Sequence, residues 1–140
     1  MTLSSITYKL GRKIYLSGTY GKFTSRKIYD VCKSSAGFDV IIGEKEFELK
    51  SGKTRFTEDE RKILITIVKD TISRSAPNDV YYEEDGEDKI YYHFYKDNNG
   101  DIYLVGVKYF KTHNIGFFET VYKTDIRNSH KGLKKLGDKK

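Results

Sequence analysis

The sequence has no tryptophan, one cysteine and one proline among its 140 residues, and only three histidines. The single cysteine, Cys32, excludes an intramolecular disulfide and cannot complete a zinc site. The histidines are not spaced as metal ligands are. We therefore expect no metal and no other cofactor, and we interpret Cys32 as a small, half-buried apolar residue.

Long apolar runs are also missing. No segment approaches the roughly 20 apolar residues of a membrane-spanning helix, and the first residues lack the apolar stretch of a secretion signal. We expect no membrane partner and a cytoplasmic location, with delivery into another cell by a larger machine as an open alternative. Residues 51–54 resemble the end of a phosphate-binding loop, but Phe47 stands where the first glycine of that loop is needed.

Positive charge is in excess and is unevenly distributed along the chain. The net charge is +6. Residues 1–33 carry seven basic side chains against Asp30 alone, residues 123–140 carry seven against Asp125 and Asp138, and residues 79–88 hold six acids and no base. Clustered basic residues attract polyanions and accelerate their encounter. We therefore predict an anionic partner, with RNA in first place.

The length and composition favour one α+β domain, which we place at residues 1–130, followed by a basic flexible tail at residues 131–140. The clearest element is one long helix from Thr57 to Arg74. Thr57 and Glu60 have the spacing of a capping box, and Pro77 disfavours helix at the residue before it. The apolar residues that recur at helical spacing are Ile63, Leu64, Ile67, Val68, Thr71 and Ile72.

Four strands are predicted after the helix. Alternating patterns indicate strands at 80–82, 89–96, 102–111 and 115–123, with turn signals at 85–86, 98–100 and 113–116. Short joins imply antiparallel neighbours, so we expect a four-stranded antiparallel meander packed on the helix. In the N-terminal third we expect a strand or helical turn at 14–16, a short helix at 24–33, and two short strands at 38–42 and 46–49.

The phase of these strands decides which face each side chain occupies. If Asn99-Gly100 forms a two-residue turn, His93 lies opposite Gly106 and Tyr91 lies opposite Lys108. A glycine opposite a histidine would leave a hollow with a titratable group at its edge. The face toward the helix would carry Ile90, Tyr92, Phe94, Tyr103, Val105, Val107 and Tyr109, and the open face Lys89, Tyr91, His93, Tyr95, Leu104, Gly106, Lys108 and Phe110.

The next hairpin leaves two alternatives open. If Lys111 pairs with Gly116, then Glu119 joins Lys108 and His93 on the open face. A slip of one residue in this pairing would instead place two other side chains on that face, Thr120 and Tyr122.

This constellation has the groups that RNA cleavage by internal transfer requires. The reaction needs a base for the 2′-hydroxyl, an acid for the leaving 5′-oxygen and a cation or donor for the phosphorane-like state, but no metal. His93 can be acid or base because its ordinary pKa is near neutrality, and Glu119 can be the base. Lys108 can stabilise the developing charge, and Thr120 and Tyr122 can donate hydrogen bonds. The predicted RNA contacts are Tyr91, Tyr95, Lys111, His113 and Lys123.

Each of these residues also has a purely structural interpretation. A lone histidine on a sheet face is often packed or merely exposed, and Lys108 beside Glu119 can be an ordinary cross-strand ion pair. Thr120 and Tyr122 are residue types that strands favour for packing alone. His113 falls in a turn, where solvation alone accounts for it.

The order of the predicted elements resembles the barnase–EndoU–colicin–RelE-like group of small RNases, phage-encoded members included. The resemblance covers residues 54–126 and rests on Pro77-Asn-Asp-Val-Tyr81 before the first meander strand and Thr120-Val-Tyr122 in the last. It implies a metal-independent endoribonuclease, a toxin or effector, with an inhibitor or antitoxin protein as partner. The chain departs from the group at residues 53–61, which hold no histidine.

Two non-enzymatic alternatives use the same features. The open face can bind RNA or an anionic protein without cleaving it, or a small phage or mobile-element protein can inhibit a host factor through charged contacts. The ribonuclease interpretation requires that His93 emerge from the uncovered face with a cationic neighbour.

Overall fold

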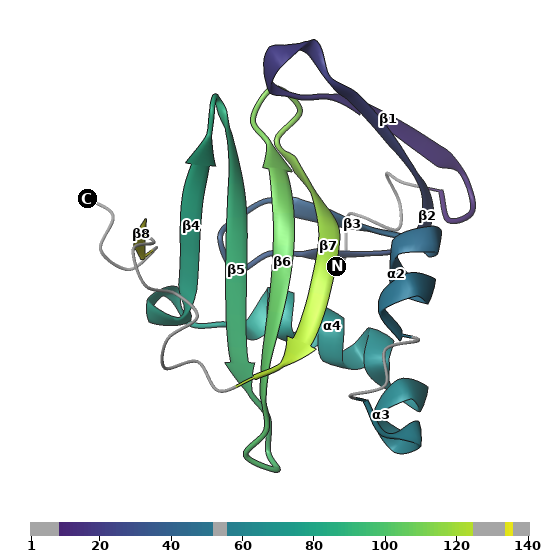
Figure 1. Ribbon diagram of the computed structural model, residues 1–140, viewed down its shortest axis with the longest axis vertical. Helices are drawn as coiled ribbons and strands as arrows, with labels where there is room; N and C mark the ends of the chain where they lie inside the picture. The colour runs from purple at the N-terminus through teal and green to yellow at the C-terminus, as the bar shows by residue number, and fades with distance from the viewer. Residues whose placement is uncertain (1–8, 52–55, 125–133, 136–140) are drawn as a thin grey trace.

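The computed structural model describes residues 9–51, 56–124 and 134–135, which form a mixed sheet with helices on one face (Figure 1). The strand order is β1-β2-β3-β7-β6-β5-β4-β8. β3 and β7 are parallel, and the other neighbouring pairs are antiparallel. The strands are β1 (Lys13–Ser17), β2 (Phe23–Lys33), β3 (Asp39–Gly43), β4 (Val80–Asp85), β5 (Asp88–Lys96), β6 (Ile102–Phe110), β7 (Ile115–Lys123) and β8 (Lys134–Lys135).

The α+β class is confirmed, but the expectation of a four-stranded, purely antiparallel sheet is wrong. The meander β4-β5-β6-β7 exists as predicted. It is extended on one side by β3 and β2, because residues 24–33 form strand β2 rather than the expected helix. Residues 14–16 lie in strand β1, whereas 46–49 lie in helix α2 (Glu44–Ser51) and not in a strand. Of the predicted tail, Lys134 and Lys135 pair with β4, and its other residues lie outside the described part of the chain.

The long helix predicted from Thr57 to Arg74 is two helices, α3 (Glu58–Lys62) and α4 (Leu64–Arg74). The capping box is confirmed: the Thr57 side chain accepts from the backbone of Glu60, and Glu60 accepts from the backbone of Thr57. The helix breaks at Ile63, which is 54% exposed instead of joining the apolar stripe. After α4, the short turn η2 (Pro77–Asp79) leads into β4.

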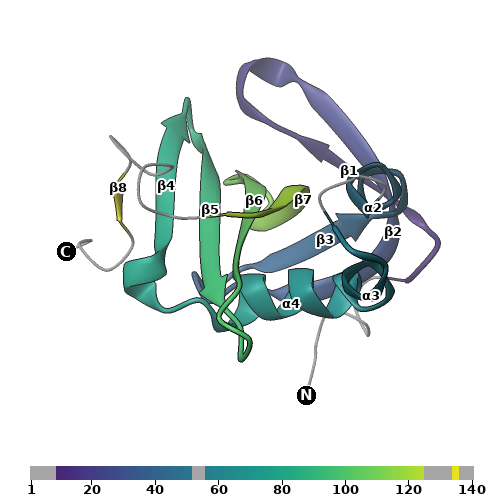
Figure 2. The same cartoon turned by 60° about the horizontal axis from the view of Figure 1, so that its bottom comes forward.

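Helix α4 lies across the sheet and covers the main core (Figure 2). Leu64, Val68 and Ile72 have no exposed surface, because their spacing places them along the side of the helix that faces the sheet. They pack against residues of β5, β6 and β7, including Val105 and Phe118. None of the described helices is long and apolar enough to cross a bilayer.

The turn between β5 and β6 overturns the predicted strand phase. Asn98, Asn99 and Gly100 form a three-residue connection, in which the Asp97 backbone N–H donates to the carbonyl of Asp101. Gly100 has φ 86°, the left-handed conformation that closes such a turn. The predicted loop of two residues was therefore one residue too short. Because side chains alternate along a strand, that residue exchanges the two faces of β5 relative to β6.

The corrected register inverts the assignment of β5. Tyr92, rather than His93, lies opposite Gly106, and Ile90, rather than Tyr91, lies opposite Lys108. The predicted hollow beside Gly106 is not formed, because a Cβ at this glycine would lie 3.0 Å from the methyl group of Thr120. The open face of β5 carries Ile90, Tyr92 and Phe94, and the helix-covered face carries Tyr91, His93 and Tyr95.

The pairing of β6 with β7 shifts between Gly106 and Val107, where β7 contributes one extra residue. Glu119 is that bulged residue, so the predicted pairing of Glu119 with Lys108 is wrong. Beyond the bulge the alternative register holds: Thr120 lies opposite Gly106, and Tyr122 lies opposite Leu104.

An arm, here defined as residues 13–28, leaves the sheet and bends over its open face. It consists of β1, the 3-10 turn η1 (Thr19–Gly21) and the first part of β2, and Figure 1 shows it arching beside the ends of β6 and β7. The inner side of the arm is apolar, and Leu16 and Ile28 pack on Phe110 and Phe117. A second, smaller core thereby forms on the face opposite α4.

Candidate nucleic-acid interface

His93, the centre of the predicted active site, has no exposed surface. It lies in the layer between the sheet and α4, where Ser34 Oγ is 2.7 Å from its Nε2. Burial lowers the pKa of His93 to about 4, so the ring is neutral at physiological pH. The predicted exposure of His93 is wrong, and an imidazole closed off from solvent cannot contact a nucleic-acid strand.

Two predicted catalytic residues, Lys108 and Glu119, do line one hollow on the open face. It has a volume of about 380 Å³ and lies between the arm and the sheet. Both charges are already compensated there. Lys108 forms an ion pair with Asp85, and Glu119 Oε2 lies 3.2 Å from a guanidinium nitrogen of Arg26.

Thr120 and Tyr122 share this face with Lys108, as the alternative register implied. The Thr120 hydroxyl is buried without a hydrogen bond to any described residue, and its methyl group packs toward Gly106. Tyr122 is 39% exposed. The structure thus gathers Lys108, Glu119, Thr120 and Tyr122 on one side of the sheet and His93 on the other.

The predicted RNA contacts are also dispersed. Tyr91 is 5% exposed and Tyr95 is half-buried, both on the helix-covered face. Lys111 is exposed in the turn between β6 and β7. Lys123 Nζ lies 2.5 Å from Glu60 Oε2. Since Lys123 ties β7 to α3, it serves the fold rather than an open surface.

The carboxylate of Glu60 is the other half of that contact. Its Oε2 also accepts a hydrogen bond of 2.9 Å from the Tyr103 hydroxyl. Burial alone would raise the pKa of Glu60, but hydrogen bonds from Lys123, Thr57 and Tyr103 lower it to about 2. The Glu60 carboxylate, which caps α3, therefore joins this helix to Tyr103 of β6 and Lys123 of β7.

A different surface, the outer side of the arm, combines exposed aromatic rings with basic side chains. The β1–β2 register places Lys13, Tyr15 and Ser17 on the same side as Phe23, Ser25 and Lys27. Phe23 is 82% exposed and Tyr15 is 66% exposed. We call these six residues the arm face. Arg12 and Lys22 are exposed at its two ends.

The charges of the arm face are unusual for a hairpin. Lys13 lies directly opposite Lys27, and like charges in that position destabilise a pair of strands. Lys27 makes only a long surface contact, 3.7 Å to Glu44. No ion pair involves Arg12, Lys13 or Lys22 within the described residues. The arm face therefore keeps positive charge that the described residues do not neutralise.

The tip of the arm is fastened to the meander by a clasp, defined here as Ser17, Thr19, Asp88 and His113. Asp88 Oδ2 accepts from the backbone and hydroxyl of Thr19 at 2.6 and 2.7 Å. Asp88 Oδ1 accepts from the backbone of Lys111 at 3.0 Å. The backbone N–H of Ser17 donates to His113 Nε2 at 3.1 Å, so this predicted RNA contact instead belongs to the clasp.

Burial of Asp88 would raise its pKa, but its hydrogen bonds with Thr19 and Lys111 outweigh that effect and lower it. Asp88 is thus ionised and fully used as an acceptor at neutral pH. The clasp holds the arm in a fixed position, and with it the rings of Tyr15 and Phe23.

The sequence predicted a basic region here but did not predict the arm face. The excess of basic residues in 1–33 was visible, whereas the helix predicted at 24–33 hid the alternation that brings Phe23 and Lys27 to one side. Strand alternation from Lys13 to Lys27 is the signal that would have found the arm face.

Within the described residues, no three histidine, cysteine, aspartate or glutamate side chains gather as metal ligands do. Cys32 is buried, and burial raises the pKa of its thiol to about 12. Comparison with protein-family models, curated proteins and solved structures found no match to this chain. The resemblance to small RNases therefore stays a prediction from short motifs.

Proposed function

We propose that the protein is a non-catalytic binding module for single-stranded nucleic acid and that the arm face is its binding surface. The observation that supports this most strongly is the Lys13–Lys27 pair, two like charges opposite each other beside two exposed rings. A phosphate between the two ammonium groups would turn their repulsion into attraction. RNA is the partner expected from the sequence, and DNA strands offer the same phosphates and bases.

The aromatic residues supply the second half of the recognition. Tyr15 and Phe23 are diagonal neighbours on the hairpin, at a separation of about 7–8 Å. Each ring can stack on a base, which contributes about 1–3 kcal/mol per base without sequence preference. An arm face with two rings and flanking cations therefore fits an unpaired strand better than a duplex, whose bases are already stacked.

Fluorescence anisotropy with a labelled single-stranded RNA tests the proposal. We expect Phe23→Ala and Tyr15→Ala to weaken binding about tenfold each, and Lys13→Gln to weaken it less. Contacts with three or four phosphates predict a salt dependence with a slope of about −2 to −3 in logarithmic units. Tyr122→Ala and Lys96→Gln, which alter an exposed ring and an exposed cation elsewhere, are the controls.

The result that would overturn the proposal is binding that ignores Tyr15 and Phe23, or that Tyr122→Ala reduces equally. A duplex of the same sequence should bind more weakly than the single strand. A DNA strand of the same sequence shows whether the 2′-hydroxyl contributes to affinity.

Endoribonuclease activity is the second candidate; because His93 is buried, only a version that does without it is left, supported by Lys108 and Glu119 lining one hollow with Arg26. There Glu119 would take the proton of the 2′-hydroxyl, the 2′-oxygen would bond to phosphorus, and the bond to the 5′-oxygen would break. Lys108 would return a proton to that 5′-oxygen, with Arg26 beside the phosphate.

This candidate predicts fragments with 2′,3′-cyclic phosphate ends when mixed RNA is incubated with the protein in EDTA. Glu119→Gln should abolish the fragments, whereas a folded His93→Gln variant should leave them unchanged. If neither the wild-type protein nor these variants releases fragments above the buffer control, cleavage is excluded and binding alone remains.

A further inference from the structure

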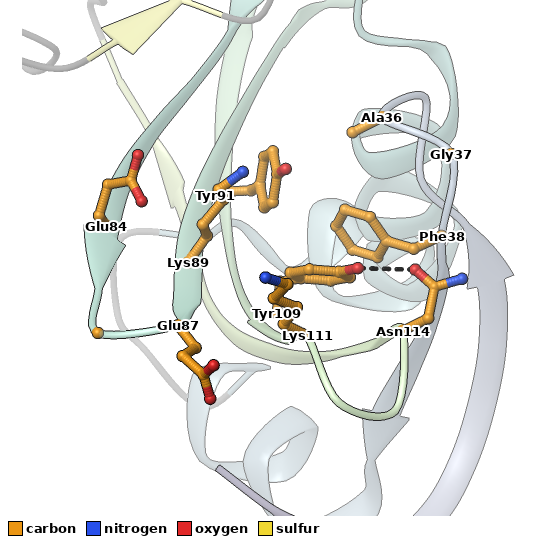
Figure 3. Close-up of a pocket in the computed structure, with 11 residues that line it drawn as sticks. Ala36, Gly37, Phe38, Glu84, Glu87, Lys89, Tyr91, Tyr109, Lys111 and Asn114 are labelled. Atoms are coloured by element: carbon orange, nitrogen blue, oxygen red, sulfur yellow. Dashed lines mark hydrogen bonds between the residues drawn. The ribbon is translucent and has the colours of Figure 1, made fainter. Parts of the chain in front are cut away.

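A second hollow, which no residue of the arm lines, lies on the face of the sheet that carries Tyr91 and Tyr109 (Figure 3). Its volume of about 510 Å³ falls in the range of small-molecule sites. Three turns surround it: the β2–β3 turn with Ala36 and Gly37, the β4–β5 turn with Glu87, and the β6–β7 turn. We call it the three-turn pocket.

The floor of the three-turn pocket is aromatic. The ring of Phe38 lies 5.0 Å from that of Tyr91 and 4.6 Å from that of Tyr109, measured between centroids. Tyr91 and Tyr109 meet edge to face at 5.8 Å. The three rings hold one another in place, and Figure 3 shows them side by side within the pocket. Such a floor favours a planar apolar group over a sugar or an aliphatic chain.

One polar group in this floor has no partner. Tyr91 is 95% buried, since its exposed fraction is 5%, yet its hydroxyl makes no hydrogen bond with any described residue. The neighbouring Tyr109 hydroxyl, by contrast, donates to Asn114 Oδ1 at 2.7 Å. The Tyr91 hydroxyl is not among the fully buried unpaired side-chain atoms, so it opens into the pocket rather than being enclosed by protein. Tyr91 lines the pocket and keeps a hydrogen-bonding group available to a ligand.

The rim of the three-turn pocket carries both signs of charge. Glu87 and Lys111 are exposed on neighbouring turns, and neither forms an ion pair with any residue that the structure describes. Glu84 and Lys89, the other two charged lining residues, lie opposite each other in the β4–β5 pairing. A ligand that bridges Glu87 and Lys111 therefore needs a cation and an anion of its own.

We propose that the three-turn pocket binds a free aromatic α-amino acid as a zwitterion. The aromatic side chain lies on Phe38 and Tyr109, the α-carboxylate meets Lys111, and the α-ammonium meets Glu87. The Tyr91 hydroxyl supplies a hydrogen bond from below. A mononucleotide fits less well, because it brings a phosphate for Lys111 but no cation for Glu87. This site does not depend on the nucleic-acid proposal.

L-tryptophan is the probe of choice, because the protein contains no tryptophan and indole emission then reports the ligand alone. The full chain is titrated into L-tryptophan, and the anisotropy of that emission is measured. Indole-3-propionate lacks the ammonium group and tryptamine lacks the carboxylate. We expect each analogue to bind about tenfold more weakly than tryptophan, equivalent to one lost charged contact.

Variants locate the site. Glu87→Gln should remove the preference for tryptophan over indole-3-propionate, and Lys111→Gln should remove the preference over tryptamine. Tyr91→Phe should weaken tryptophan binding, whereas Tyr95→Phe and Lys96→Gln should leave it unchanged.

Three results would overturn the proposal: no change of anisotropy at millimolar protein, analogues that bind as tightly as tryptophan, or Glu87→Gln and Lys111→Gln variants that bind tryptophan as tightly as the wild-type protein. Because Glu87 and Lys111 are exposed, both variants should fold, and circular dichroism verifies this directly.

Discussion

Phe118 lies within strand β7 and Phe23 at the start of strand β2. Phe118 has no exposed surface, whereas Phe23 is 82% exposed. Phe118 faces the core beneath α4, within the meander. Phe23 lies on the arm, which buries only its inner side. The meander therefore uses its aromatic residues for packing, while the arm displays them. Exposed rings that contribute little to the fold are available for binding.

The largest expected effect tests this contrast directly. Phe118→Ala should lower the free energy of unfolding by about 3–5 kcal/mol, because it opens a cavity in the main core. Phe23→Ala should change it by less than about 0.5 kcal/mol, since an exposed side chain loses few contacts. Urea unfolding followed by circular dichroism measures both. A similar loss in the two variants would show that the arm is part of the packed core.

The buried imidazole of His93 makes the stability of the protein sensitive to acid. The unfolded histidine binds a proton below about pH 6.5, whereas the folded one does so only near its pKa of about 4. The unfolded state therefore binds more protons between these values, and stability falls as the pH drops from 6.5 to 4. The loss should reach up to about 3 kcal/mol.

Urea unfolding of the wild-type protein and of His93→Leu across this pH range measures the effect. The variant should lack the wild-type decline, while His113→Gln should retain it. An equal decline in His93→Leu would assign the acid sensitivity to other groups.

The clasp should control the arm without affecting the meander. Asp88→Asn keeps one carbonyl acceptor but turns an amide N–H₂ toward either Thr19 or Lys111, which both donate. We expect a local loss of about 1–3 kcal/mol, seen as faster hydrogen exchange of arm amides. Amides in the centre of β5 and β6 should exchange as in the wild-type protein. Glu87→Gln removes a charge from the same turn but keeps the backbone N–H that donates to the Thr19 hydroxyl at 3.2 Å, so it is the matched control.

The smallest expected effect concerns Lys13, which lies opposite Lys27 in the arm. Lys13→Glu replaces repulsion of Lys27 by attraction and should stabilise the hairpin by about 0.2–1 kcal/mol. The same change should weaken binding of single-stranded RNA, because it removes a cation from the arm face. Lys13→Gln separates the lost repulsion from the new attraction. Tighter binding by Lys13→Glu would contradict the role of the arm face.

The sequence predicted the meander and the end of α4 because their periodicity is regular and Pro77 and the turn residues mark their limits. It failed on β2, where the bulge between Ile28 and Asp30 interrupts the alternation and leaves Ile28, Val31 and Cys32 at helix-like spacing. Helix α2 was missed because Phe47 and Leu49 do not recur at helical spacing.

The candidate site was harder to predict than the fold, since it depended on one turn. Asn98-Asn-Gly100 is compatible with a loop of two or three residues, and sequence alone does not choose between them. The two-residue turn predicts His93 on the surface, whereas the three-residue turn of the structure accompanies a buried His93. Charge clustering in residues 1–33 needed no register, and the arm lies within this segment.

The clasp has a consequence for how the arm face can bind. A free hairpin would have to give up conformational entropy each time it ordered its rings around a ligand. Fastened at the tip by Thr19 and Asp88 and at the base by the sheet, the arm has lost that freedom during folding. Tyr15 and Phe23 are thus preorganised, and association with a flexible strand needs to order only the strand.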